Sequence, residues 1–281
     1  MNIKLGKNAY GKNAVNLSKI IRHDDHHEFR QISVNSALEG DFETAHTIGD
    51  NSQILATDTQ KNTVYILAKE HFTKGIEDFG LYLSNFFFSN NPQVSKVNVE
   101  IVEHLYARMA FDGTVHQHAY ISSGNEKHTT TIVQDKDGVA ITAGIKDLLI
   151  LKTTDSAFAG YIKEPYTILK ETTDRILATQ CEATWAYNSV NIDFTAMFGE
   201  IRTTLLKTFA FHKSFSVQQT LYAMGEAVLQ TYPEVTEISL IMPNKHHIPY
   251  NMEPFGLANT NEIFMATDEP FGYITGTVVR G

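Results

Sequence analysis

The chain lacks most of the features that would cross-link it or hold it in a membrane. Its 281 residues include a single cysteine, Cys181, so no disulfide can form within the chain. No apolar run approaches the roughly 20 residues that a membrane-spanning helix needs, and the residues Met1–Lys7 lack the charged-then-apolar pattern of a secretory leader. These absences favour a reducing, cytoplasmic location.

Positive charge is also scarce. The sequence has 23 Lys and Arg residues against 32 Asp and Glu residues, which gives a formal net charge of −9. Binding a phosphate backbone normally needs clustered Lys and Arg, so the composition argues against a nucleic-acid partner. Any anionic ligand must therefore be held by a local cation.

Several common catalytic motifs are missing. The sequence has no Gly-x-Gly-x-x-Gly after a strand, no Gly-Lys-Ser/Thr phosphate loop and no Gly-x-Ser-x-Gly elbow. Cys181 lies in a strand-like segment near Trp185, which indicates a packing role rather than a nucleophile. Nucleotide cofactors and covalent catalysis both lose support.

The chain contains a weak internal repeat. Pro92–Val99 and Pro233–Leu240 share a pattern of Pro, acid or amide, Val, polar, charged, β-branched, polar and aliphatic residues, about half a chain length apart. Each copy follows a helical-looking apolar stretch and leads into a strand-like continuation. With 42% hydrophobic residues, the chain is long enough for one large or two small domains, and the repeat predicts two copies of one unit.

Periodicity predicts the elements of each copy. Apolar residues alternate with polar ones on both sides of the polar break His23–Glu28, which predicts a β-hairpin. Thr57 or Asp58 is expected to cap a helix. Further elements are expected as helix Ile76–Ser89, strand Val94–Phe111, strands Ala140–Lys152 and Cys181–Tyr187, helices Asp193–Phe211 and Val217–Tyr232, and strand Val235–Met242.

Four separated motifs resemble urate oxidase. They are Tyr10-Gly11-Lys12, Ala56–Tyr65 (ATDTQKNTVY), Ser216–Tyr222 (SVQQTLY) and Pro243–His247 (PNKHH), and they occur in the family's order over nearly the whole chain. The resemblance implies an α+β fold of two tandem tunnelling-fold (T-fold) units, residues 1–136 and 137–281. Each unit would be an antiparallel four-stranded sheet with helices on one face. The resemblance also implies a homotetramer whose subunits join edge to edge into a barrel, and assembly agrees with the need of open sheet edges to be paired or covered.

The resemblance also implies a purine clamp. A planar anion is held economically by a bidentate guanidinium, a carboxamide and an aromatic ring on its face. The matching positions are Arg175, Gln218 and Phe158, with Leu169 and the backbone of Val217 as further contacts. Taken singly, each has an ordinary structural explanation as an ion pair, a solvated amide or core packing.

The chemistry implied by the family is cofactor-independent oxidation of urate by dioxygen and water to 5-hydroxyisourate and hydrogen peroxide. A proton relay falls on Lys12, Thr57 and His246, Asn244 would hold dioxygen or water, and Asp58 would orient Thr57 or contact urate. The family places Lys12 and Thr57 in one subunit and the clamp, Asn244 and His246 in its neighbour. No metal is expected.

Other interpretations stay open. The histidines of His23–His27 and the pair His116 and His118 suggest a metal enzyme, but the first group is interpreted as a solvated turn and the second as a strand-face pair. A zinc-dependent T-fold enzyme acting on a purine or pterin, or a non-catalytic purine-binding protein, are the alternatives. Family positions are altered at Ala159, Pro165 and Ile168, and the C-terminal Thr277–Gly281 lacks a Ser-Lys-Leu peroxisomal signal, which favours a bacterial cytosolic enzyme.

Overall fold

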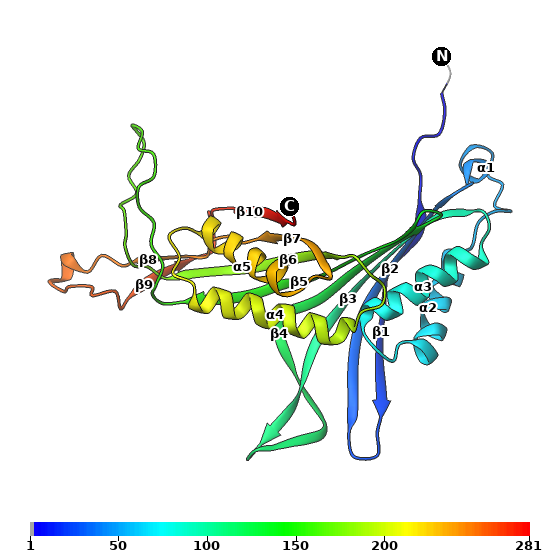
Figure 1. The fold of residues 1–281 in the computed structure, drawn as a ribbon, viewed down its shortest axis with the longest axis horizontal. Helices are drawn as coiled ribbons and strands as arrows, with labels where there is room; N and C mark the ends of the chain where they lie inside the picture. The colour runs from blue at the N-terminus through cyan, green and yellow to red at the C-terminus, as the bar shows by residue number, and fades with distance from the viewer. Residues whose placement is uncertain (1–2) are drawn as a thin grey trace. The chain divides into compact units, whose positions relative to one another are not determined.

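A computed structural model describes residues 3–281 as an α+β chain of antiparallel strands and a few helices (Figure 1). The chain divides into two compact units. The first comprises residues up to Gly144 together with Ala186–Phe198, and the second comprises Ile145–Trp185 and Gly199–Gly281. No helix among the described residues is both long and apolar enough to cross a membrane.

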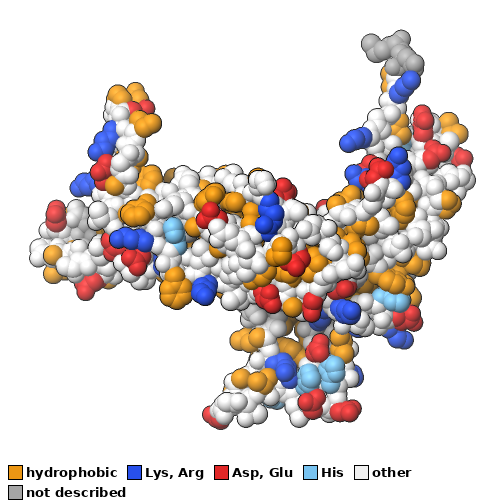
Figure 2. Space-filling model, in the orientation of Figure 1, with side chains coloured by type: hydrophobic (Ala, Val, Ile, Leu, Met, Phe, Trp, Pro, Cys, Tyr) orange, Lys and Arg blue, Asp and Glu red, His pale blue; other side chains and the backbone are white. Residues whose placement is uncertain are grey.

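The first unit begins with the expected hairpin. Strand β1 (Tyr10–Arg22) pairs antiparallel with β2 (His27–Gly40), and the polar break forms the turn between them. Strands β3 (Val94–Phe111) and β4 (Thr114–Asp135) extend the sheet in the order β1-β2-β3-β4. Histidine and acidic side chains gather at the end of the β1–β2 hairpin, in the lower part of Figure 2.

Helices cover this sheet. α1 (Glu43–Thr47) is short, α2 (Thr57–His71) packs on β1, and α3 (Ile76–Asn90) packs on β3 and β4. α3 turns an apolar face to the sheet, on which Phe79, Leu83 and Phe87 have no exposed surface. Burial of such side chains contributes about 1.5–3 kcal/mol each.

The predicted cap of α2 is wrong. Thr57 is already the first helical residue, Ala56 occupies the N-cap position, and no side chain accepts a capping hydrogen bond there. The Asp58 carboxylate instead accepts hydrogen bonds from the side chains of Lys61 and Asn62. A carboxylate in the first turn still interacts favourably with the helix dipole.

Inside the first unit, four charged side chains form a buried cluster. His128 Nε2 lies 2.7 Å from Glu77 Oε1, and His128 Nδ1 lies 3.6 Å from Glu103 Oε2. Arg30 donates to both oxygens of Glu103, at 2.6 and 2.8 Å, and the Phe198 ring stacks on His128 at 3.7 Å. We call Arg30, Glu77, Glu103 and His128 the buried charge cluster.

The later elements follow a similar order along the chain, strands first and then helices. β5 (Gly138–Lys152) and β6 (Leu177–Tyr187) precede α4 (Phe194–Phe211) and α5 (Val217–Thr231). β7 (Val235–Ile241) lies between β6 and β10 (Thr275–Val279), and α5 packs on β7 and β10. The short β8 (His246–Pro249) and β9 (Phe264–Thr267) form a separate ribbon, with the 3-10 turn Glu253–Phe255 between them.

Cys181 is a core residue, as expected. It lies on β6 and is 1% exposed. The fully buried Trp185 follows four residues later on the same face of the strand. Burial raises the pKa of its thiol to about 12. Burial therefore disfavours the thiolate, which is the nucleophilic form, and agrees with a packing role.

Candidate active site

The structure brings Lys12 and Thr57 together in the first unit. Both line one open cavity of about 500 Å³. The remaining lining comes from β1, β2 and the segment before β1, with Ala9, Tyr10, Gly11, Asn13, Ser36 and Ala37. Asp58 follows Thr57 on α2 but is exposed and is not part of this lining.

A bulge in β1 sets the direction of Lys12. The pairing of β1 with β2 shifts between Lys12 and Val15, and Ala14 has a positive φ of 55°. The Ala14 N–H is satisfied by Asn35 Oδ1 at 2.8 Å. A β-bulge bends its strand and redirects a side chain, which is how Lys12 comes to the cavity. Gly11 is required beside it, because a Cβ there would lie 1.7 Å from the Ser36 carbonyl oxygen.

A buried polar network holds α2 against this bulge. The Ser36 hydroxyl donates to Gln60 Oε1 at 2.9 Å, and Gln60 Nε2 donates to the Leu55 carbonyl at 3.3 Å. The Leu55 N–H donates to the Tyr10 hydroxyl at 2.8 Å. Gln60 is fully buried, so these bonds fix the first turn of α2, and with it Thr57.

Sequence analysis missed Ser36 and Gln60, although one signal was present. Gln60 lies on the same face of α2 as the buried Val64 and Ala68, at a spacing of four residues. A polar residue on an apolar stripe indicates a buried hydrogen bond, because an unpaired amide there would be costly.

The second unit holds the predicted clamp. Arg175 lies over the Phe158 ring at 5.2 Å, and the Tyr161 ring stacks on the same Phe158 at 5.0 Å with planes 16° apart. Burial lowers the pKa of Arg175, and its buried Nε has no hydrogen-bond partner among the described residues. A buried guanidinium N–H without a hydrogen-bond partner costs folding free energy. The Arg175 Nε–H group is therefore suited to donate a hydrogen bond to an acceptor atom of a bound ligand.

Backbone hydrogen bonds join the Phe158 loop to the start of α5. The Ala157 N–H donates to the Ser214 carbonyl at 2.8 Å, and the Phe158 N–H donates to the Thr172 carbonyl at 2.8 Å. The Ser216 hydroxyl caps α5 by accepting from the Gln219 N–H at 3.1 Å. The next two residues of α5 differ in exposure, since Val217 is buried and Gln218 is exposed.

Asn244 and His246 lie at and just before the start of β8. Asn244 is 9% exposed and forms an isolated bridge with Thr179, four residues after Arg175. His246 is half-buried and begins β8, where it pairs with Thr267. Asn244 therefore precedes the strand rather than sharing it with His246. Lys245 forms an ion pair with Asp268 at 2.8 Å.

Leu169 lies on an exposed loop. It is 59% exposed, at the end of a loop whose Ile162, Tyr166 and Ile168 are each more than four-fifths exposed. The Tyr161 hydroxyl donates to the Leu169 carbonyl at 2.5 Å, which ties this loop to the ring that stacks on Phe158. An exposed apolar loop of this kind is typical of a contact surface.

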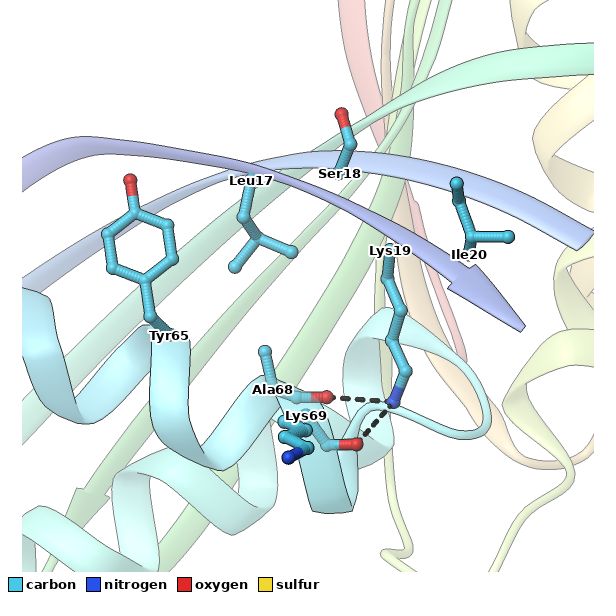
Figure 3. A pocket seen from close by; sticks show the side chains of 7 residues that line it. All are labelled: Leu17, Ser18, Lys19, Ile20, Tyr65, Ala68 and Lys69. Atoms are coloured by element: carbon cyan, nitrogen blue, oxygen red, sulfur yellow. Dashed lines mark hydrogen bonds between the residues drawn. The ribbon is translucent and has the colours of Figure 1, made fainter. Parts of the chain in front are cut away.

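A further cavity, of about 320 Å³, contains none of the predicted residues. It lies between β1 and α2, where Lys19 reaches the end of the helix and donates to the carbonyls of Ala68 and Lys69 at 2.8 and 3.0 Å (Figure 3). The Lys19 ammonium group therefore caps the C-terminal end of α2, and this stabilising role accounts for the position of Lys19 in the cavity.

The same architecture occurs in a known class of enzyme structures. The crystal structure of uricase from Arthrobacter globiformis matches with a TM-score of 0.95 and 43% identity, over 100% of this chain and 96% of that one. A uricase structure from Bacillus fastidious, 24% identical, matches with a TM-score of 0.82 over 96% of this chain and 93% of that one, and shows the shared fold.

Sequence comparison agrees with the structural match. Residues 8–133 and 141–275 match the family model described as uricase. Uricase of Arthrobacter globiformis is 43% identical over 99% of this chain and 90% of its own length, and uricase of Danio rerio is 36% identical over 99% of this chain and 96% of its own. The chain belongs to the uricase family.

Proposed function

We propose that this protein is a urate oxidase that converts urate, dioxygen and water to 5-hydroxyisourate and hydrogen peroxide without a metal or flavin. The observation that carries the proposal is a family match over nearly the whole chain, together with a shared cavity for Lys12 and Thr57. The reaction balances as a two-electron oxidation of urate, with dioxygen reduced to peroxide and water supplying the new hydroxyl group.

The clamp residues supply recognition in this proposal. Arg175 donates to the carbonyl edge of urate, Gln218 pairs with the opposite amide edge, and Phe158 stacks on the ring. The buried, unpaired Nε of Arg175 supports its role, since a ligand acceptor would satisfy it. Val217, at the start of α5, contacts urate through its backbone. Leu169 covers the apolar side of the urate pocket.

The relay residues supply the chemistry. Lys12 accepts a proton from urate through the Thr57 hydroxyl, which both accepts and donates, and His246 exchanges protons with solvent. The urate dianion then gives electrons to dioxygen, which Asn244 holds over the ring. Asp58 orients Thr57 or contacts urate.

The active site is assembled from two subunits of a homotetramer in this proposal. Lys12 and Thr57 of one subunit face the Phe158, Arg175 and Asn244 group of its neighbour. The large apolar side chains exposed around the clamp support an interface there, including the loop that ends at Leu169. The repeated element order supports two tandem T-fold units, residues 1–136 and 137–281, whose sheets form a barrel on assembly.

One experiment tests the activity directly. Protein is stripped of metal and kept with a chelator, mixed with urate in air, and followed by the ultraviolet absorbance of urate with peroxide assayed in parallel. We expect loss of urate with an equal yield of peroxide. Urate binding without its loss would contradict the oxidase, and activity that returns only with added metal would contradict cofactor independence.

A further inference from the structure

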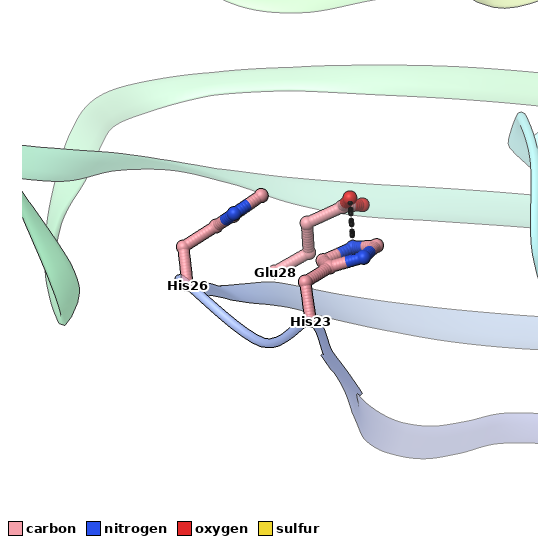
Figure 4. Close-up of side chains that lie close together, drawn as sticks. All are labelled: His23, His26 and Glu28. Atoms are coloured by element: carbon pink, nitrogen blue, oxygen red, sulfur yellow. Dashed lines mark hydrogen bonds and ion pairs between the residues drawn. The ribbon is translucent and has the colours of Figure 1, made fainter.

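The turn between β1 and β2 carries an arrangement of side chains that urate oxidation does not use. His23 ends the β1 side of the turn, His26 begins the β2 side, and Glu28 follows on β2. One potential ligand atom from each of these three residues lies within 4.8 Å of the others. Their side chains project from the same side of the turn (Figure 4).

We propose that His23, His26 and Glu28 form a binding site for a divalent transition-metal ion, with zinc or nickel as the expected occupants. Imidazole nitrogen and carboxylate oxygen are the donors that these ions prefer. This site is separate from the proposed oxidation of urate and does not depend on it. None of its three residues lines the Lys12 cavity.

The geometry needs only a small adjustment to hold an ion. Ligand atoms about 2.1 Å from a tetrahedral zinc ion lie about 3.4 Å from one another. His23 Nε2 and Glu28 Oε1 are a hydrogen-bonded pair 2.7 Å apart, which would separate by about 0.7 Å around an ion, and the two imidazole rings stack at 4.6 Å. The three side chains are 27–48% exposed, so they are free to move by the ångström or so that remains.

A fourth residue prepares His26 for coordination. Asp25 Oδ1 lies 2.7 Å from His26 Nδ1, which holds the proton on that nitrogen and leaves Nε2 with its lone pair. Metal-bound histidines are commonly oriented by a carboxylate in this way. Asp24, Asp25 and Glu28 also make the turn locally acidic, which attracts a cation.

The test is titration of the stripped, intact protein with zinc chloride or nickel chloride in a buffer that does not bind metal. We expect about one ion per chain with micromolar affinity. His23→Gln and Glu28→Gln should each weaken binding by at least about tenfold. Asp25→Asn should weaken metal binding by about tenfold, because it removes the carboxylate that orients His26 and leaves all three ligands in place.

Two controls distinguish this site from its neighbours. His46→Gln changes a histidine of α1 whose Nδ1 is bonded to the Phe42 carbonyl, and it should leave metal binding unchanged. His116→Gln combined with His118→Gln tests the adjacent β3–β4 hairpin, where the two rings lie 4.7 Å apart, and should also leave binding unchanged.

The outcomes separate clearly. Absence of binding at 100-fold excess over protein, or loss of binding in the His116 and His118 double variant with retention in His23→Gln, would overturn the proposal. Cobalt substitution gives a second readout, because its visible spectrum should change between wild type and Glu28→Gln. Because these residues lie outside the proposed catalytic groups, urate oxidation by the stripped variants should equal that of wild type.

Discussion

Lys12 and Thr57 are the residues on which the proposed proton transfer depends. Lys12→Met and Thr57→Ala should each lower turnover by about 10²–10⁴-fold, because general-base catalysis contributes on that scale, while urate binding changes little. Initial rates and anaerobic equilibrium dialysis of urate measure the two effects separately.

A matched control lies on the next turn of the same helix. Lys61→Met removes a lysine that is bonded to Asp58 on α2 but does not line the cavity, and it should leave turnover within about twofold of wild type. Unchanged turnover in Lys12→Met would rule out the relay.

Arg175 should act on binding rather than on turnover. Arg175→Ala removes charge-assisted hydrogen bonds worth about 1.5–3 kcal/mol, so urate should bind about 10–150-fold more weakly. Arg175→Lys should restore only a small part of this affinity, because an ammonium lacks the planar fork of the guanidinium. Anaerobic dialysis measures the affinity, and full rescue by lysine would show that Arg175 provides charge alone.

At the scale of elements, local patterns predicted the secondary structure well. The strand predicted at Val94–Phe111 is β3 with the same limits, and the helix predicted from Ile76 is α3. Both predictions rest on the periodicity of apolar side chains, which can be read from residues close together in the sequence. The cap at Thr57 was predicted wrongly because a Thr-Asp pair is equally compatible with a cap and with a first helical turn.

Features made by distant residues could not be predicted. Ser36 and Gln60 are 24 positions apart, and Glu77 and His128 are 51 apart, so no local pattern links them. The positive φ of Ala14 accompanies a hydrogen bond from its N–H to Asn35 on β2, 21 positions away. The candidate catalytic residues were named through the family resemblance, since no single motif around Arg175 or Asn244 distinguishes a ligand contact from an ordinary polar residue.

The buried charge cluster joins β2, α3, β3 and β4, and it should make stability depend on pH. Burial alone lowers the pKa of His128, but Glu77 and Glu103 outweigh it and raise that pKa above its usual 6.5. Burial raises the pKa of Glu103, yet His128 and Arg30 outweigh it and hold that pKa below its usual 4.5. The contribution of His128 to the free energy of unfolding is thus complete below pH 6.5. It is lost as the pH rises through the pKa that His128 has in the folded protein.

The Glu103 contribution has the opposite sign. It is present above pH 4.5 and is lost as pH falls through the folded pKa of this carboxyl. Both contributions are therefore complete between pH 4.5 and 6.5. His128→Gln should lower the free energy of unfolding by about 3 kcal/mol within this window, and by less at alkaline pH.

Urea unfolding at several pH values from 5 to 9 measures this dependence. The control is His104→Gln, which removes a half-buried histidine on β3 outside the cluster and should leave the shape of the pH curve unchanged. Parallel curves for wild type and His128→Gln would show that His128 does not carry the alkaline loss of stability.

For the whole molecule, the proposed sharing of the site between subunits predicts complementation. Lys12→Met chains should turn urate over slowly and Arg175→Ala chains should bind it weakly, so each homo-oligomer is expected to have little activity at a urate concentration that leaves the Arg175→Ala sites largely empty. When the two are co-expressed at equal levels, about a quarter of the sites combine an intact Lys12 with an intact Arg175, so about a quarter of wild-type activity should return.

The matched control is co-expression of Lys12→Met with Thr57→Ala. Both residues come from the same subunit in the proposed site, so no combination restores it and activity should stay absent. Equal activity in the two mixtures would contradict the proposed division of the site.

The burial of Cys181 makes the folded protein inert to thiol reagents. Because it is the only cysteine and is 1% exposed, a maleimide should react with it only when β6 separates from its neighbours. Labelling kinetics of the unmodified protein would then report the opening of the second unit. A cysteine introduced elsewhere could be labelled alone, with a fluorophore or a spin label, without first replacing the native one.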